Sequence, residues 1–262
     1  MQTPAGGNRL ITIPISHFCE KARWALDRAQ VPYTEERHLQ AIHVAYALRA
    51  GGRRTVPVLV SAGGEVLPES AAIMRWADGR LEPAARLYPD GPQGAEAARI
   101  EAWLDAGLGP DARLWMYEST LPVMDELAPW ILAGTPRWER RALRAGSWAL
   151  DPFIRRYLGV SAQNASAALE RVDAVFDEVA RLLGDGRPYL CGERFTAADL
   201  AFGALSAAVL IPETYGSPLP PVDVLPATMA AHVRRLRAHD AGRFAARLYA
   251  QDRHRAPPGP GP

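Results

Sequence analysis

The stretch Arg9–Leu26, RLITIPISHFCEKARWAL, decides the fold. Its first part, Arg9–Pro14, is short and rich in β-branched residues, which is typical of a strand. From Phe18 onward, apolar residues recur at spacings that place them on one face of a helix. Pro32 follows the expected end of that helix, as it often does, because proline cannot continue a helix. The stretch therefore predicts a strand–helix unit.

Alternation of β-rich runs and helical stretches continues to about residue 80. Residues 33–39 predict a second strand, and residues 42–50 predict a short helix before two glycines. Residues 56–61 and 65–67 are β-rich and flank Ala-Gly-Gly, a hairpin signal, and residues 69–78 predict a helix. The resulting order, βαβαββα, is that of an α/β domain.

Beyond this region the strand signal disappears. We expect a first domain at residues 1–82, a linker rich in proline and glycine at 83–94, and an all-α domain at 95–252. The tail 253–262 is too rich in proline and glycine to pack, so we expect disorder there. Helices are predicted at residues 95–106, 111–119, 137–150, 169–183, 197–211 and 226–238.

Composition excludes several classes of function. The 262 residues include 30 basic and 29 acidic side chains, and this near balance gives no reason to expect nucleic acid or a membrane surface as partner. No apolar run reaches the ~20 residues of a membrane helix, and no signal-peptide pattern is present, so we expect a cytoplasmic protein. Two cysteines are too few for a zinc cluster, so no metal is expected. Lys21 is the only lysine, which indicates a GC-rich coding sequence and favours a bacterial source.

Ser16 is the first candidate site residue, because it lies where the first strand ends and the first helix begins. Unpaired N–H groups and the helix dipole stabilise a thiolate at such a position, whether the sulfur belongs to the protein or to a bound thiol. A purely structural interpretation is also open, since Ser is a favoured N-cap and Cys19 suits a buried position on the helix.

Two further motifs suit a peptide-like ligand. Pro57 opens an apolar strand, and a cis bond before it would turn the backbone of Val56 outward, although most such bonds are trans. Glu69 and Ser70 open the following helix, where free N–H groups suit a carboxylate and a Glu side chain suits an ammonium group. Helix capping alone would explain the same residues.

A fourth motif concerns folding. In Phe195–Leu200, FTAADL, Thr196 and Asp199 predict a capping box at a helix N-terminus, with Phe195 and Leu200 as the hydrophobic staple.

Taken in order, the motifs SHFCEKARWAL, TVPVLV, LPESAAIMRWA and YLCGERFTAADLAFGAL resemble those of the cytosolic glutathione S-transferases. The resemblance covers nearly the whole chain. It implies a thioredoxin-like N-terminal domain followed by an all-α domain, and a homodimer. It also implies an enzyme that activates glutathione as a thiolate for attack on a small hydrophobic electrophile.

The resemblance assigns the residues that would bind glutathione. Ser16 matches the serine-type hydroxyl that hydrogen-bonds the glutathione sulfur. Val56, before Pro57, matches the residue whose backbone pairs with the cysteinyl part, and Glu69 and Ser70 match the pair that holds the γ-glutamyl end. Candidate partners for the glycyl carboxylate are Arg53, Arg54 and His43.

The electrophile is expected to bind between the domains. The segment Asp111–Thr120, DARLWMYEST, and the helix before it supply aromatic and Met side chains that suit an apolar pocket but serve equally well in a core. These residues are Trp103, Trp115, Met116 and Tyr117. The long stretch between Gly107 and Asn164 predicts an extra helical element near the cleft.

The sequence is compatible with other active residues and other functions. The spacing S-x-x-C leaves open that Cys19, instead of Ser16, is the active residue. In that interpretation Cys19 forms mixed disulfides. The same thiolate would serve an isomerase or eliminase, and another small thiol could replace glutathione. The chain could also be a binding or scaffold protein without activity, although the joint presence of Ser16, Pro57, Glu69 and Ser70 argues against it.

Overall fold

A four-stranded sheet forms the base of the N-terminal part of the chain in the computed structural model. The structure describes residues 6–254, except for the side chains at 144, 145 and 147–150. The strand order is β2-β1-β3-β4, with β1 and β2 parallel and the other neighbours antiparallel. The elements are β1 (Asn8–Thr12), α1 (His17–Arg28), β2 (Tyr33–Arg37), α2 (His43–Arg49), β3 (Val58–Val60), β4 (Val66–Leu67) and α3 (Ser70–Asp78). The predicted order βαβαββα and the thioredoxin-like class are confirmed.

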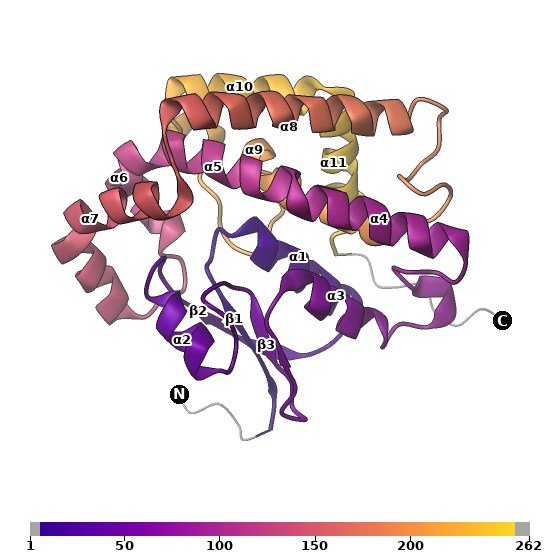
Figure 1. Cartoon of the computed structure of the whole chain (residues 1–262), viewed down its shortest axis with the longest axis horizontal. Coiled ribbons are helices and arrows are strands. Elements are labelled where there is room, and N and C mark those ends of the chain that lie inside the picture. The colour runs from indigo at the N-terminus through magenta and orange to yellow at the C-terminus, as the bar shows by residue number, and fades with distance from the viewer. Residues whose placement is uncertain (1–5, 255–262) are drawn as a thin grey trace.

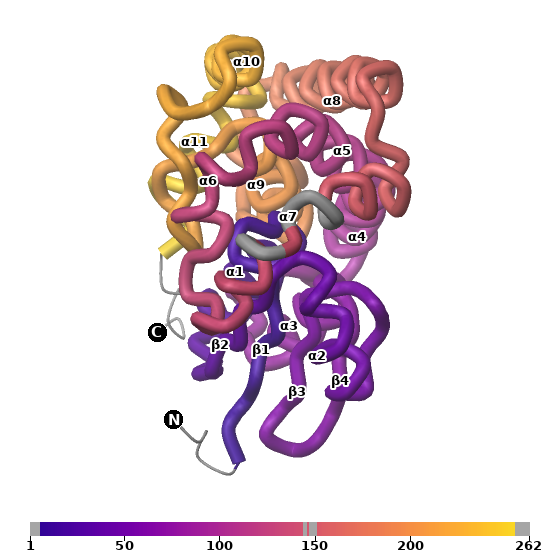
Figure 2. The backbone as a smooth tube through the Cα atoms, turned by 90° about the vertical axis from the view of Figure 1, so that its left-hand side faces the viewer, coloured from indigo at the N-terminus to yellow at the C-terminus, as the bar shows by residue number. Residues whose placement is uncertain are grey.

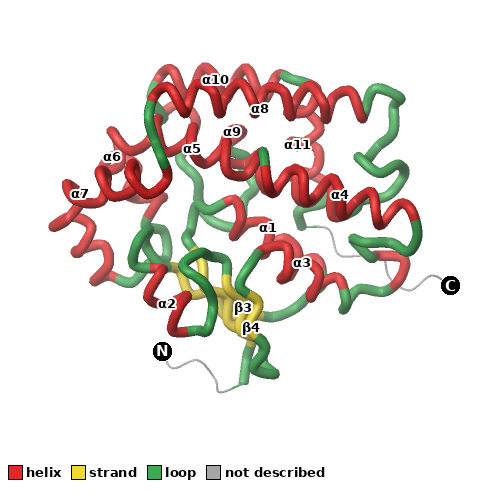
Figure 3. Tube along the Cα trace, in the orientation of Figure 1, coloured by secondary structure: helices red, strands yellow, loops and turns green. Residues whose placement is uncertain are grey.

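Helices cover both faces of this sheet. Successive residues of a strand point to opposite faces, so each strand supplies side chains to the core on either face. Leu10 and Leu59 pack into the large core that includes α1 and α3. Their neighbours Ile11 and Val58 pack against Ala47 of α2. Figure 3 shows the strands in yellow with α2 and the pair α1 and α3 around them.

The rest of the described chain is helical. The helix α9 is buried at every position, and α1, α4, α5, α10 and α11 pack against it (Figure 1). The elements are η1 (Pro83–Ala85), α4 (Pro92–Ala106), α5 (Leu108–Thr120), η2 (Leu121–Val123), α6 (Met124–Ile131), α7 (Arg137–Leu158), α8 (Ala162–Leu182), α9 (Ala197–Leu210), η3 (Val222–Val224), α10 (Ala227–Ala238) and α11 (Asp240–Gln251). All six predicted helices are present, whereas α6 and α11 were missed.

The ends of the predicted segments differ from the structure. Pro92 begins α4 inside the stretch expected to be a linker. Arg253, expected in a disordered tail, is buried, and its Nε lies 2.6 Å from Oε1 of Glu20 on α1. The prediction of disorder is therefore wrong at Arg253, because a buried carboxylate binds the guanidinium there. Residues 255–262 of that predicted tail lie outside the described residues.

Charged contacts join the two parts of the chain. Nζ of Lys21 on α1 lies 2.8 Å from Oε1 of Glu101 and 2.6 Å from Oδ2 of Asp105, both on α4. Figure 2 shows α4 and α5 above α1 and α3, which lie between them and the strands. The capping box is confirmed as well, since the N–H of Thr196 donates to Asp199 over 2.8 Å.

Within residues 6–254, no helix has both the length and the apolar character needed to cross a bilayer.

Candidate active site

Ser16 is the N-cap of α1, and its side chain has both of the roles considered from sequence. Its Oγ accepts a hydrogen bond from the N–H of Cys19 over 3.3 Å, as in an ordinary cap. The residue also lines a cavity of about 280 Å³, which we call the Ser16 cavity. Because a hydroxyl both accepts and donates, the cap leaves the proton of Ser16 available to a ligand.

Cys19 is placed differently from Ser16. Its side chain is 0% exposed and does not line the Ser16 cavity. Burial raises the pKa of the Cys19 thiol, and the nearby charge of Arg23 and the hydroxyl of Ser16 only oppose that shift. A buried thiol with a raised pKa is a poor nucleophile, so the structure argues against Cys19 as the active residue.

The Ser16 cavity lies between the two parts of the chain. Its wall comes from residues 13–18, from α2, from residues 54–56, from α5 and from α7. Val56, which precedes a cis peptide bond to Pro57, belongs to this wall. Neither the N–H nor the C=O of Val56 forms a hydrogen bond within the described part of the chain. Its backbone is thus free to pair with a ligand.

A second cavity, of about 270 Å³, adjoins the first and is called the Ser70 cavity. Glu69, Ser70 and Pro57 line it. Glu69 is the N-cap of α3, and its side chain makes no cap hydrogen bond, so the first N–H groups of α3 are open to a carboxylate. The two cavities share four residues: Phe18, Thr55, Val56 and Arg113.

The three candidates for the glycyl carboxylate separate clearly in the structure. Arg53 forms an ion pair with Glu69 and lines neither cavity. His43 lines the Ser16 cavity, but burial lowers its pKa, so it is neutral near pH 7. Arg54 is exposed, lines the same cavity, and is in no ion pair among the described residues.

Arg113 is a site residue that the sequence did not single out. It extends from α5 to the wall that the two cavities share, and no acidic side chain in the described chain pairs with it. Its charge helps to lower the pKa of His17, although burial is the larger cause, and the resulting pKa is about 3. Burial also raises the pKa of Tyr117 to about 12, a shift that Arg113 opposes. Both ring side chains are therefore uncharged near pH 7.

Two of the four residues predicted for the electrophile pocket are elsewhere. Met116 and Tyr117 line the Ser16 cavity. Trp115 points into the core against His232, at a ring distance of 6.1 Å. Trp103 lines a separate depression beside Glu178 on α8. Trp103 and Trp115 therefore do not line the Ser16 cavity, because these faces of α4 and α5 turn toward other helices.

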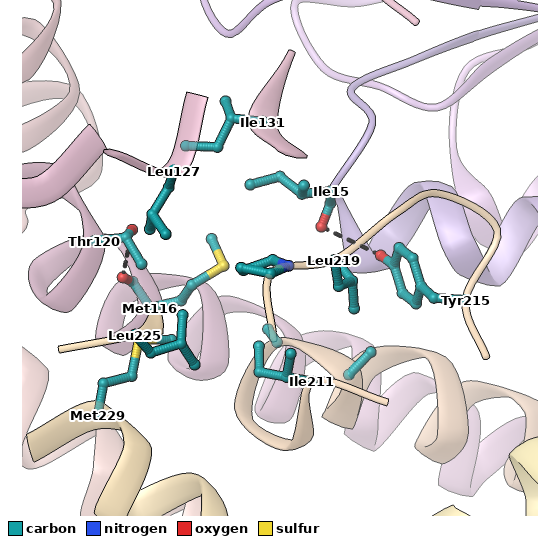
Figure 4. Close-up of a pocket in the computed structure, with 13 residues that line it drawn as sticks. Ile15, Met116, Thr120, Leu127, Ile131, Ile211, Tyr215, Leu219, Leu225 and Met229 are labelled. Atoms are coloured by element: carbon teal, nitrogen blue, oxygen red, sulfur yellow. Dashed lines mark hydrogen bonds between the residues drawn. The ribbon is translucent and has the colours of Figure 1, made fainter. Parts of the chain in front are cut away.

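An apolar cavity of about 30 Å³ lies behind Met116, and we call it the Tyr215 cavity. Figure 4 shows Ile15, Met116 and Leu219 converging on it, with the hydroxyl of Tyr215 donating to the carbonyl of Ile15 over 3.2 Å. Ile15 and Met116 also line the Ser16 cavity, so they form the partition between the two. The volume of the Tyr215 cavity accommodates about one water-sized group.

Among the residues that the structure describes, no cluster of three or more His, Cys, Asp and Glu side chains is arranged to hold a metal ion.

The fold and the paired cavities define a class of protein, in which a thioredoxin-like domain lies beside an all-helical domain and cavities open between them. Residues 10–84 match the family model of the glutathione S-transferase N-terminal domain, and residues 161–205 match that of the C-terminal domain. Both parts of the chain therefore match domains of the glutathione S-transferase family. Residues 85–160, which include α4 to α7, lie outside both matches.

Solved structures show the same fold. A glutathione S-transferase of Ceriporiopsis subvermispora in complex with glutathione has a TM-score of 0.62 at 16% identity, covering 97% of this chain and 100% of that chain. A glutathione transferase of Phanerochaete chrysosporium has a TM-score of 0.60 at 17% identity, covering 93% and 96%. A glutathione S-transferase of Methylobacterium radiotolerans in complex with glutathione sulfonate has a TM-score of 0.53 at 23% identity, covering 91% and 94%. No curated protein matches the sequence.

Proposed function

We propose that the chain is a glutathione-dependent transferase that activates the thiol of glutathione and transfers it to a small hydrophobic electrophile. One observation carries this proposal. The hydroxyl of Ser16 and the free backbone of Val56 line one cavity, and Val56 continues into the cavity of Glu69 and Ser70. An extended tripeptide paired with Val56 would reach a hydroxyl donor with its sulfur and the N-terminus of α3 with its γ-glutamyl end. The neighbours in complex with glutathione and glutathione sulfonate support this ligand.

Ser16 has the central role in the proposed chemistry. A free thiol has a pKa of about 8.5 and is mostly protonated at pH 7. The Ser16 hydroxyl donates a hydrogen bond to the sulfur, and the positive end of α1 favours the negative charge. Arg113 adds a cation on the wall that the two cavities share. Together these groups lower the pKa of the bound thiol.

The two carboxylates of glutathione need separate partners. The open N-terminus of α3, with the Ser70 hydroxyl, binds the γ-glutamyl carboxylate, and Glu69 binds the adjacent ammonium group. We assign the glycyl carboxylate to Arg54, because Arg53 is paired with Glu69 and His43 is neutral.

The transfer step is a nucleophilic displacement. The thiol proton leaves to solvent, the thiolate sulfur forms a bond to the electrophilic carbon, and the leaving group departs with its electron pair. An isomerase or eliminase would use the same thiolate but release glutathione afterwards. Titration of the remaining free thiol after turnover separates the two, because only conjugation consumes glutathione.

Calorimetric titration with glutathione tests this proposal. We expect binding with a Kd between micromolar and low millimolar, weakened about tenfold or more in Glu69→Ala, the size of one lost charged contact. Glu82→Ala is the matched control, since Glu82 is also an exposed N-cap without a cap hydrogen bond but lies outside both cavities. The control should bind like the wild type. Absence of binding to the wild type would contradict the proposal and favour another thiol or a scaffold role.

The homodimer and the cytoplasmic location stay predictions. Light scattering of the purified protein gives the molar mass in solution and tests the dimer directly.

A further inference from the structure

The backbone that leads into Ser16 is bound by side chains from other parts of the chain. Residues 13–15 connect β1 to α1, and each of their three carbonyls accepts a hydrogen bond from a side chain. Nη2 of Arg23 donates to the first two, over 3.3 and 3.0 Å. The hydroxyl of Tyr215 donates to the third, that of Ile15, over 3.2 Å (Figure 4). Two side chains therefore hold all three carbonyls before Ser16.

The bond from Tyr215 acts on the peptide group that carries Ser16. The carbonyl of Ile15 and the N–H of Ser16 belong to one planar, rigid peptide group. That N–H donates in turn to the carbonyl of Ile13 over 3.2 Å. Both polar groups of this peptide are thus bonded, and rotating it would break both bonds. Because Cα of Ser16 lies in the same plane, the direction of its side chain follows the orientation of the peptide.

Tyr215 belongs to the segment that follows α9, in the helical part of the chain. The next residue, Gly216, is bonded to the thioredoxin-like domain through both of its backbone groups. Its N–H donates to the buried carboxylate of Glu20 over 3.0 Å, and its carbonyl accepts from Nη2 of Arg37 over 3.0 Å. A Cβ at Gly216 would lie 2.6 Å from Oε2 of Glu20, so this close approach requires glycine.

Buried charges connect the two side chains that bind residues 13–15. Glu20 is 0% exposed, and its carboxylate accepts from Nε of Arg253 over 2.6 Å and from Nη1 of Arg23 over 3.4 Å. The guanidinium of Arg23 also lies 6.0 Å from the ring centroid of Tyr215. Breaking a buried ion pair leaves an uncompensated charge, which is strongly unfavourable. The network therefore keeps Tyr215 in place beside the backbone that it binds.

Tyr215 does not touch the ligand site itself. It lines neither the Ser16 cavity nor the Ser70 cavity. Burial and the nearby carboxylate of Glu20 raise the pKa of the Tyr215 hydroxyl well above its usual value, so the hydroxyl keeps the proton that it donates. An effect of Tyr215 on a bound thiol must then pass through the peptide group before Ser16.

We propose that Tyr215 is a positioning residue for thiol activation: its hydroxyl fixes the peptide before Ser16 and so directs the Ser16 hydroxyl at the sulfur of bound glutathione. This inference rests on the proposed function and adds to it a residue that neither family match includes. A hydrogen bond weakens steeply as its angle departs from linear. A small rotation of the peptide would therefore weaken the stabilisation of the thiolate without removing Ser16.

Tyr215→Phe tests the inference, because it removes the hydroxyl and keeps the ring that packs against the core. Ultraviolet absorbance of the thiolate gives the pKa of bound glutathione in the wild type and the variant. We expect the variant to raise that pKa by about half a unit to one unit, a roughly three- to tenfold fall in the acid dissociation constant. The Kd of glutathione below pH ~6, where the thiol is protonated, should stay within about twofold.

Two further variants separate positioning from a general structural effect. Tyr189→Phe is the matched control, since its hydroxyl donates to Oδ1 of Asp252 over the same 3.2 Å and lies outside both cavities. It should leave the thiol pKa unchanged. In a Ser16→Ala background, Tyr215→Phe should cause no further rise, because two residues that act through one contact are not additive.

Each result has a defined meaning. A thiol pKa in Tyr215→Phe equal to that in the wild type would overturn the inference alone, and so would an equal rise in Tyr189→Phe. A full rise in the Ser16→Ala background would also overturn it, since Tyr215 would then act without Ser16. So would a Kd that weakens in step with the pKa, because this would be a general loss of the site. If the wild type does not bind glutathione, or leaves its thiol at the free pKa, the proposed function fails and the inference fails with it.

Discussion

Nε2 of His17 lies 2.9 Å from the carbonyl oxygen of Gly109, so the first residue of α1 is hydrogen-bonded to the first turn of α5. A carbonyl only accepts, so Nε2 carries the proton. Gly109 is also in close contact with the ring of Phe18, since a Cβ there would lie 2.4 Å from the ring. Ser16, adjacent to His17, is thereby held at a fixed position relative to the helical domain.

This buried histidine makes stability depend on pH. Burial lowers the pKa of His17 to about 3, whereas an unfolded histidine has a pKa of about 6.5. The unfolded state therefore binds more protons between these values, and the stability from neutral His17 is complete above pH ~6.5 and lost as the pH falls. We expect this residue alone to reduce the free energy of unfolding by about 2 kcal/mol between pH 7 and pH 5.

Denaturant unfolding of the wild type and of His17→Gln at both pH values checks the expectation. Other histidines, including His43, whose pKa is also lowered, remain in both proteins. The pH dependence should therefore be smaller in His17→Gln by the stated amount. Identical pH dependence in the two proteins would show that His17 is not held neutral.

Lys21 is expected to be important for stability. Its side chain is fully buried and pairs with the buried Glu101 and the half-buried Asp105, so Lys21→Met removes the nearer cation of Glu101 and leaves it only the longer pair with Arg75. Removing one partner of a buried ion pair costs about 3–5 kcal/mol. Arg99→Met, which breaks an exposed pair with Glu96 on the same helix, should cost less than about 1 kcal/mol in the same unfolding measurement. Equal losses for both variants would contradict the assignment.

Met116 is predicted to limit the length of the bound electrophile, because it is part of the partition between the Ser16 and Tyr215 cavities. Met116→Ala should lower the free energy of unfolding by about 2–4 kcal/mol and tighten binding of S-hexylglutathione relative to S-methylglutathione about tenfold. Met229→Ala is the control, since Met229 lines the Tyr215 cavity alone. It should lose similar stability without the gain in affinity, and a gain in both variants would contradict the role of Met116.

Local sequence signals predicted most of the fold. The strand–helix unit around Ser16 and the hairpin before Glu69 depend on near neighbours in the chain, so periodicity and turn residues identify them. The helix α6 was missed because it is short and contains Pro129. The helix α11 contains Gly242, which lowers helix propensity but is required because a Cβ there would lie 1.9 Å from the carbonyl oxygen of Leu236.

Some residues of the candidate site could likewise be identified from local sequence, whereas others depend on tertiary packing. Ser16 and Ser70 could be found from sequence, since each marks the start of a helix after a strand. Which face of a helix turns to the cleft depends on tertiary packing, so Trp115 was misplaced and Arg113 was missed. A single arginine in a helix has the same pattern as an ordinary surface charge. Only its position in the wall shared by the Ser16 and Ser70 cavities distinguishes Arg113 from such a surface charge.

The thiol pKa of bound glutathione tests the central claim most directly, and ultraviolet absorbance of the thiolate during a pH titration reports it. With the wild type we expect a pKa about one to two units below the free value of about 8.5. Ser161→Ala removes an N-cap of the same kind, whose Oγ accepts from Asn164 over 3.2 Å, and should leave that pKa unchanged. Ser16→Ala should still bind glutathione but return its pKa close to the free value. A thiol pKa in Ser16→Ala equal to that in the wild type would contradict the assignment of Ser16 as the residue that activates the thiol.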